Sequence, residues 1–452
     1  ITCSCVTGLS RMPVSAGLET QSYLWSPRRN LRKLLEETVA PQLLEGELAA
    51  AMKLLLHADS ENKLNHQKLY LVLDLDETLA YSKRMPPGEV AVGHTIFVRG
   101  EPYDMVLRPG LQQFLRVATQ NFIVYLYTMG DEDYTQAALS VIDPERTLFA
   151  GGICCWRPSE SRSHKNLDRV LCDKRMALIV DDTVDVWQDD LANLCLVRRF
   201  IGDPKDDGLM RLASQIQHVH RTYFTDVGTF NLDDPSSKPP PDVRDVLQQI
   251  RGGLLEGCQI ALTGVAQVDE ETLDYHPLCH LVRLYGAQLT LSVETATHLV
   301  ARKKDGWQNS SKIRKALQRR QEHKTDFHAV WDHWLLDSIC SWDRQPEESY
   351  AIPPASPEDV ESKAPSSAAF AATATFFPDV DLQNGDGLSE GDRQLLSLDV
   401  PTLPTRKRSR GPPQGSLGVS ADNSGPSRIP IEQYLRQNLE RQKSVALGPN
   451  PK

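Results

Sequence analysis

The run LYLVLDLDETL (residues 69–79) places two carboxylates directly after an apolar strand. Its apolar residues from Leu69 to Leu75 do not alternate with polar ones, which is typical of a strand that is covered on both faces. Asp74 and Asp76 lie two residues apart where the strand gives way to a loop, so both can point into one crevice. In open α/β sheets, ligands bind just beyond the carboxyl ends of the strands. The run therefore predicts a buried parallel strand with a polar site at its end.

Three further apolar runs extend this interpretation. They are FIVYLY (122–127), MALIV (176–180) and 194–197, with helix-like segments at 111–119 and 134–141 between them. Strands that alternate with helices predict a doubly wound parallel sheet. Two more strand ends carry polar groups, because Thr128 follows the second run and Asp181 and Asp182 follow the third. We expect these side chains to meet Asp74 at one edge of the sheet.

The two carboxylates after the first strand suit phosphoryl transfer. A side-chain oxygen of Asp74 and the backbone carbonyl of Asp76 can share Mg²⁺, which prefers oxygen ligands. The metal would neutralise charge, so that Asp74 can attack phosphorus and form an aspartyl-phosphate. Asp76 would protonate the leaving oxygen and later deprotonate the hydrolytic water. A solvated loop is the alternative interpretation of a bare D-x-D, but the apolar strand before it favours the catalytic one.

DLDETL resembles the first motif of the haloacid dehalogenase superfamily. Residues 68–226 more narrowly resemble the TFIIF-associating C-terminal-domain phosphatases of RNA polymerase II. The resemblance rests on six blocks: DLDETL (74–79), DMVLRPGLQQFL (104–115), VYLYTMGDEDY (124–134), IDPERTLF (142–149), SHKNLDRVL (163–171) and ALIVDDTVDVW (177–187). Six blocks in one order are far more specific than any single block. Asp143, in the fourth block, is expected to hold the turn before Pro144.

The resemblance implies a role for each polar residue of these blocks. Thr128 would offer its hydroxyl to the phosphoryl oxygens, and Lys165 would balance the negative charge there. Asp182 would complete the metal shell, with Asp181 beside it as a ligand or as a partner of the ligands. Arg108 would clamp a substrate phosphate or brace the site, and pairing with a surface acid is its alternative role.

A second unit is expected at 251–352 and resembles a BRCT domain. The pattern includes Trp334 in the last helix, followed by the small residue Ser338, and Trp334 is expected to pack in the core. Some BRCT domains bind phosphoserine, and the matching positions here would be Thr263, Gly264 and Lys312. A plain protein-docking surface is the alternative for this unit.

The remaining chain divides by composition. Leucines at helical spacing predict an N-terminal helical extension over 1–57, before the catalytic domain at 58–230. A linker rich in proline and serine is expected within 231–250. Residues 353–452 form a tail that is expected to be disordered, with a terminal helix near 431–439. The tail carries a basic cluster at 404–411, a candidate nuclear localisation signal, and an acidic-apolar stretch at 376–400 that resembles segments which dock on transcription factors.

Composition narrows the class of protein. The formal net charge of -10 argues against direct nucleic-acid binding, because phosphate backbones need a basic footprint. The nine cysteines show no regular disulfide spacing, which favours a reducing compartment, and Cys3 and Cys5 are expected to be free thiols. No apolar run reaches the length of a membrane span, and none reads as a signal peptide.

We therefore expect a Mg²⁺-dependent serine/threonine phosphatase in the nucleus whose substrate is the phosphorylated tail of RNA polymerase II. Its BRCT domain or acidic tail would contact a transcription factor. One alternative is a transcription-associated scaffold with a vestigial phosphatase site. Another is a small-molecule phosphatase, but the short segment between Leu79 and Val106 leaves little room for the cap domain that such enzymes carry.

Overall fold

The computed structural model describes residue 32 and the ranges 45–158, 164–226, 241–266, 268–322 and 327–354. Among these residues, no helix has both the length and the apolar character needed to cross a membrane. The expected terminal helix near 431–439, the basic cluster at 404–411 and the acidic-apolar stretch at 376–400 lie outside the described ranges, as do Cys3 and Cys5. The seven cysteines within the described ranges are all free.

The first sheet has five parallel strands in the order β6-β5-β1-β7-β8. They are β1 (Leu69–Leu73), β5 (Phe122–Tyr127), β6 (Gly152–Cys154), β7 (Ala177–Asp181) and β8 (Leu194–Leu196). β1 is central, and all five of its residues are fully buried. This arrangement confirms the expected doubly wound sheet, because apolar runs without alternation are stable only when helices cover both faces.

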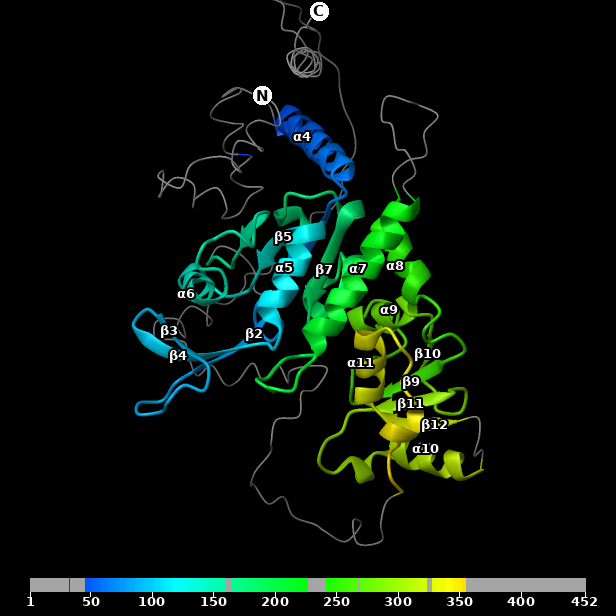
Figure 1. Cartoon of the computed structure of the whole chain (residues 1–452). Helices are drawn as coiled ribbons and strands as arrows, with labels where there is room; N and C mark the ends of the chain where they lie inside the picture. Colours follow the sequence, from blue (N-terminus) through cyan, green and yellow to red (C-terminus); the bar gives the residue numbers. More distant parts are fainter. Residues whose placement is uncertain are drawn as a thin grey trace, which may run out of the picture.

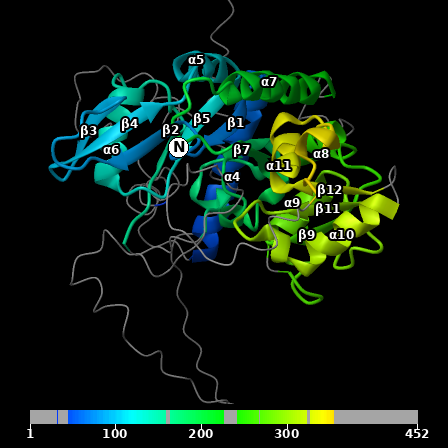
Figure 2. The same cartoon turned by 90° about the horizontal axis from the view of Figure 1, so that it is seen from below.

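Helices flank the sheet and the strands alternate with them along the chain. Figures 1 and 2 show α5 (Leu111–Asn121) and α7 (Gly208–Asp226) side by side over one face, in agreement with their mutual packing. α6 (Glu132–Ile142) lies beside the projecting strands β3 and β4. α4 (Glu45–Asn65) leads into β1 and is held to it by the hydroxyl of Tyr70, which donates to Asp59 at 2.7 Å.

The segment after the first strand forms a small sheet that the sequence did not reveal. It is antiparallel in the order β2-β4-β3, with β2 (Ala80–Arg84), β3 (His94–Val98) and β4 (Glu101–Leu107). Figure 1 shows it projecting from the main sheet. The short strands and exposed faces give little apolar periodicity, so the pattern that identified the main sheet is absent here.

The second unit contains four parallel strands in the order β10-β9-β11-β12. They are β9 (Gln259–Thr263), β10 (Gln288–Thr290), β11 (His298–Ala301) and β12 (His328–Trp331). Its helices are α9 (Pro277–Leu284), α10 (Ser311–Glu322) and α11 (Asp332–Ser341), and α8 (Val243–Arg251) precedes it. Trp334 is fully buried in α11 and donates to the backbone oxygen of Gln345 at 2.8 Å, which confirms its expected place in the core.

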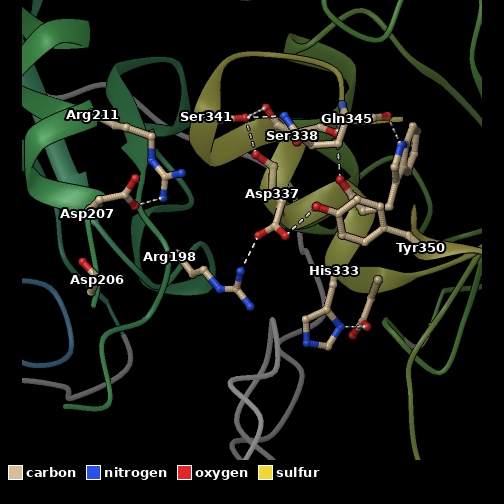
Figure 3. Close-up of polar contacts among 12 residues, drawn as sticks. Arg198, Asp206, Asp207, Arg211, His333, Asp337, Ser338, Ser341, Gln345 and Tyr350 are labelled. Carbon is tan, nitrogen blue, oxygen red and sulfur yellow. Dashed lines mark hydrogen bonds and ion pairs between the residues drawn. The ribbon is translucent and has the colours of Figure 1, made fainter. Parts of the chain in front are cut away.

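The two units pack directly on each other. α11 contacts β8, and α9 contacts the short 3-10 turns η3 (Asp185–Trp187) and η4 (Leu191–Asn193). Figure 3 shows the polar part of this contact, in which Arg198 reaches from the first unit to Asp337 on α11 at 2.8 Å. Tyr350 donates to the other oxygen of Asp337 at 2.9 Å. A single hydrophobic cluster extends from β1 into α11, so the units share a core.

Candidate active site

Polar residues meet at the ends of three neighbouring strands. Asp74 follows β1, Thr128 follows β5, and Asp181 is the last residue of β7. These strands lie side by side in parallel register, so their carboxyl ends open on the same edge of the sheet. All three residues are buried. The structure thus brings together the side chains that the strand pattern had placed at one edge.

Lys165 lies at the centre of this group. Its Nζ donates to Asp74 Oδ1 at 2.5 Å and to Asp181 Oδ2 at 2.7 Å, and the side chain is almost fully buried. Nζ also faces the rings of Tyr127 and Trp187, at 5.7 and 5.8 Å from their centroids. A buried ammonium is stable only with such partners. Lys165 therefore neutralises part of the charge that the carboxylates bring together.

Three carboxylates form a candidate cation site. Asp74, Asp181 and Asp182 each offer an oxygen, and these oxygens lie within 4.8 Å of one another. Both oxygens of Asp181 accept bonds from the protein, one of them from the indole of Trp187 at 2.8 Å. Asp182 accepts from Arg199 at 2.8 Å. A buried set of oxygen donors with excess negative charge fits a hard divalent cation such as Mg²⁺.

Burial dominates the electrostatics of these groups. Burial raises the pKa of Asp74 well above its usual value, against the opposing effect of Lys165, and the neighbouring Asp181 raises it further. Burial followed by Asp181 raises the pKa of Asp182 to about 7. Burial disfavours the charge of Lys165, but Asp181 and Asp74 outweigh this effect and raise its pKa. The protein thus crowds acidic groups where their negative charge is costly unless cations balance it.

Asp76 is held apart from the three carboxylates of the cation site by two hydroxyl groups. Thr128 Oγ1 donates to Asp76 Oδ2 at 3.1 Å, and the Tyr134 hydroxyl donates to Asp76 Oδ1. The backbone N–H of Gly130 donates to Thr128 Oγ1 at 2.9 Å and fixes that hydroxyl. Burial raises the pKa of Asp76, whereas the bonds from Tyr134 and Thr128 lower it. Thr128 therefore contacts the expected general acid, and its expected contact with a phosphoryl oxygen stays a prediction.

Arg108 is buried beside the site and does not face solvent. It is fully buried and forms a bidentate pair with Asp206, at 2.7 and 3.0 Å. It also donates to the backbone oxygens of Thr78, at 3.0 Å, and Arg198, at 2.8 Å. These bonds tie the end of the DLDETL loop to the segment after β8. Arg108 thus makes a pair with an acid, as its alternative role expected, and its bonds also join two segments beside the site. Contact with a substrate phosphate stays a prediction.

The structure also shows the surroundings of Asp143 and of the strand end at Thr263 and Gly264, for which the sequence predicted roles. Asp143 accepts from the backbone N–H groups of Thr147 and Leu148, at 2.9 and 3.0 Å, so it holds a turn as expected, but one that begins at Pro144 and does not precede it. In the second unit, Gly264 follows Thr263 at the end of β9 with φ +71°, and a Cβ added there would lie 3.9 Å from Nζ of Lys304. Lys304 is thus a lysine beside this strand end that the sequence did not single out, and phosphate binding through Thr263, Gly264 and Lys312 stays a prediction.

Several residues of the site were not identified from the sequence. Arg199 bridges Asp182 and Glu77, with 2.8 Å to each. Trp187 and Tyr134 contact Asp181 and Asp76 through single polar atoms. Aromatic residues usually indicate core packing, and the RRF run (198–200) carries no spacing signal. The positions of Trp187 and Tyr134 inside the ALIVDDTVDVW and VYLYTMGDEDY blocks were the available clue.

Comparison with known proteins agrees with this geometry. Residues 69–228 match the family model of NLI interacting factor-like phosphatases. RNA polymerase II C-terminal domain phosphatase-like 4 of Arabidopsis thaliana is 26% identical over 336 residues, which cover 65% of this chain and 72% of the relative. An RNA polymerase II C-terminal domain phosphatase of Caenorhabditis elegans is 25% identical over 293 residues, covering 58% of this chain and 43% of the relative.

A solved structure shows the same fold. Fission yeast RNA polymerase II CTD phosphatase Fcp1, bound to beryllium fluoride, superposes with a TM-score of 0.55 at 22% identity, over 66% of this chain and 100% of the other. The likeness at this identity concerns the fold alone.

Proposed function

We propose, from the match of residues 69–228 to the family model of NLI interacting factor-like phosphatases, that the chain is a Mg²⁺-dependent serine/threonine phosphatase acting through an aspartyl-phosphate. The observation that carries the proposal is the meeting of Lys165 with Asp74 and Asp181, at 2.5 and 2.7 Å, beside Asp182 and near a separately held Asp76. A nucleophile, a counter-charge and a proton donor then surround one edge of the sheet.

The reaction divides into two displacements. Asp74 attacks phosphorus and the bond to the serine or threonine oxygen breaks, while Asp76 delivers a proton to that oxygen. Water then attacks the phosphorus of the aspartyl-phosphate, the bond to Asp74 breaks, and Asp76 takes the proton from water. Lys165 stabilises the negative charge on the transferring phosphoryl group in both displacements.

Asp74 and Asp182 would hold the metal directly, with Asp181 as a further ligand or a partner of Lys165, and with the backbone carbonyl of Asp76 as the expected fourth contributor. Mg²⁺ in this place would favour the ionised form of Asp74 and offset the repulsion between carboxylate and phosphate. Arg199 and Lys165 would orient Asp182 and Asp181 toward that centre.

We assign the phosphorylated C-terminal repeats of RNA polymerase II as the substrate, and the nucleus as the site of action, because several relatives bear the name of phosphatases of that domain. The insert after the DLDETL loop is a small three-stranded sheet, which suits a site open to an extended peptide. The second unit, proposed as a BRCT domain, and the acidic-apolar stretch would contact a transcription factor.

The test uses doubly phosphorylated heptad-repeat peptides with and without Mg²⁺. The wild-type chain should release phosphate only with Mg²⁺, and Asp74→Asn should lower the rate by about 10³-fold or more, because the nucleophile is lost. Asp189→Asn, a change of one exposed carboxylate in the same domain, should leave the rate unchanged. Equal release by wild type and Asp74→Asn, or none by either, would contradict the proposal and favour a scaffold.

A further inference from the structure

Tyr134 contacts the expected general acid from a separate element. It lies in the first turn of α6, and its hydroxyl donates to Asp76 Oδ1 while Thr128 Oγ1 donates to Oδ2 at 3.1 Å. Both oxygens of one carboxyl are thus held by hydroxyl groups from two different elements. A carboxyl group turns freely about its last bond unless such contacts fix it.

The surroundings fix the ring of Tyr134 in turn. Asp131 caps α6 by accepting from the backbone N–H of Tyr134 at 3.0 Å. The ring of Tyr103, on β4, packs against it with centroids 6.4 Å apart. Gly130 leaves the space that the ring occupies, since a Cβ at that position would collide with Tyr134 Cδ1. The hydroxyl therefore reaches Asp76 from a preorganised side chain.

We propose that Tyr134 is a positioning residue that orients Asp76 for proton transfer to the leaving group. This inference rests on the proposed phosphatase function. A hydroxyl group can donate to a carboxylate and accept from a carboxylic acid, so Tyr134 can hold Asp76 both before and after the proton is transferred. Orientation of the donor atom is a large part of what general acid catalysis needs. In this proposal Tyr134 acts through Asp76, the residue to which its hydroxyl donates.

Leaving groups of different basicity separate this role from a structural one. p-Nitrophenolate leaves without a proton, whereas phenolate and above all a serine alkoxide need one. The ratio kcat/KM covers only the steps up to the aspartyl-phosphate, so it isolates the step in which Asp76 is the acid. In Tyr134→Phe, we expect kcat/KM to fall about tenfold or more for phosphoserine peptide and phenyl phosphate, and by less than about twofold for p-nitrophenyl phosphate.

Two variants complete the test. Gly130→Ala keeps the hydroxyl but displaces the ring, so it should show the same dependence on the leaving group as Tyr134→Phe. Tyr275→Phe removes the hydroxyl of an exposed tyrosine in the second unit and should match wild type on all three substrates. Thermal unfolding of each variant reports its folding separately from its kinetics.

The outcomes distinguish the two proposals. If wild type hydrolyses none of the substrates, the proposed function fails and the inference fails with it. If wild type is active but Tyr134→Phe loses the same factor on every substrate, or loses nothing on phenyl phosphate, the positioning role of Tyr134 is wrong while the phosphatase assignment stands.

Discussion

Lys165 balances the charge of the site at the scale of one residue. Its ammonium group forms ion pairs with both Asp74 and Asp181. Without it, two buried carboxylates would face each other at close range, and one of them would take up a proton. In the proposed reaction, the transferring phosphoryl group would also lose its fixed positive partner.

The substitution Lys165→Met keeps most of the side-chain volume and removes this charge. We expect phosphate release from phosphoserine peptide to fall by about 10²-fold or more, because a donor aimed at developing charge contributes on that order. Lys83→Met is the matched control and should retain full activity. It removes an exposed lysine of β2 that pairs with Glu89. Comparable rates for Lys165→Met and wild type would show that the buried ammonium does not act on the phosphoryl group.

At the scale of elements, β11, β12 and α11 meet in a stack of aromatic rings. His298 is buried between Trp334 and His328, with ring centroids 4.8 and 4.9 Å away. Burial, reinforced by His328, lowers the pKa of His298 to about 4. Unfolded histidine binds a proton near pH 6.5, so the unfolded chain binds more protons than the folded one in the interval between these values.

The resulting stability is complete above pH 6.5 and is lost as the pH falls toward about 4. We expect His298 to contribute an acid-induced loss of about 3 kcal/mol in the free energy of unfolding, at about 1.4 kcal/mol per pKa unit. Urea unfolding of wild type and His298→Phe at several pH values measures this, since the variant keeps a ring but cannot titrate. An equally steep acid limb in both proteins would assign the effect to other groups.

A sharp turn within the DLDETL loop places Glu77 in an uncommon backbone conformation. Glu77 has φ 60°, a left-handed conformation that is uncommon for a residue other than glycine. Its backbone N–H donates to Ala80 at 2.7 Å, and its carbonyl accepts from Phe200 at 2.7 Å. These bonds hold the sharp turn that takes the chain from β1 into the small antiparallel sheet. The hydrogen bond from Phe200, a residue far along the chain, helps to stabilise this unfavourable backbone conformation.

At the scale of the whole molecule, Arg251 joins α8 to the first sheet. It is almost fully buried, and it donates to the backbone oxygens of Leu194 and Ala192 while its guanidinium packs on Tyr285. By contrast, the Arg198–Asp337 pair between the units is partly exposed, and such pairs contribute little. Arg251 is therefore the stronger polar link.

Arg251→Met should lower the free energy of unfolding by about 2–4 kcal/mol, because one buried and one partly buried carbonyl lose their donor. Arg244→Met removes a more exposed arginine of the same helix, paired with Asp242, and should cost less than about 1 kcal/mol. Urea unfolding followed by tryptophan fluorescence compares the two. Similar losses in both variants would mean that the buried link adds no particular stability.

The sequence by itself determined the central strands of the first sheet and the residues at which they end. The runs LYLVL, FIVYLY and MALIV are apolar without alternation, and only a sheet covered on both faces buries them completely. Asp74, Thr128 and Asp181 stand at the ends of these runs. Their meeting could be predicted because the carboxyl ends of parallel strands lie on one edge of the sheet. The match to the observed strands is therefore a consequence of local periodicity and sheet geometry.

The tertiary structure alone decided which atoms meet. Asp76 is 58 residues from Tyr134, Arg108 is 98 residues from Asp206, and Arg199 lies 17 residues from Asp182. No periodicity encodes such contacts, because a hydrogen bond depends on positions set to a few tenths of an ångström by packing from several elements. DLDETL determined where the carboxylates stand at the end of the first strand, and the packing around that strand end decided which carboxylate is balanced by an ammonium and which is held by two hydroxyl groups.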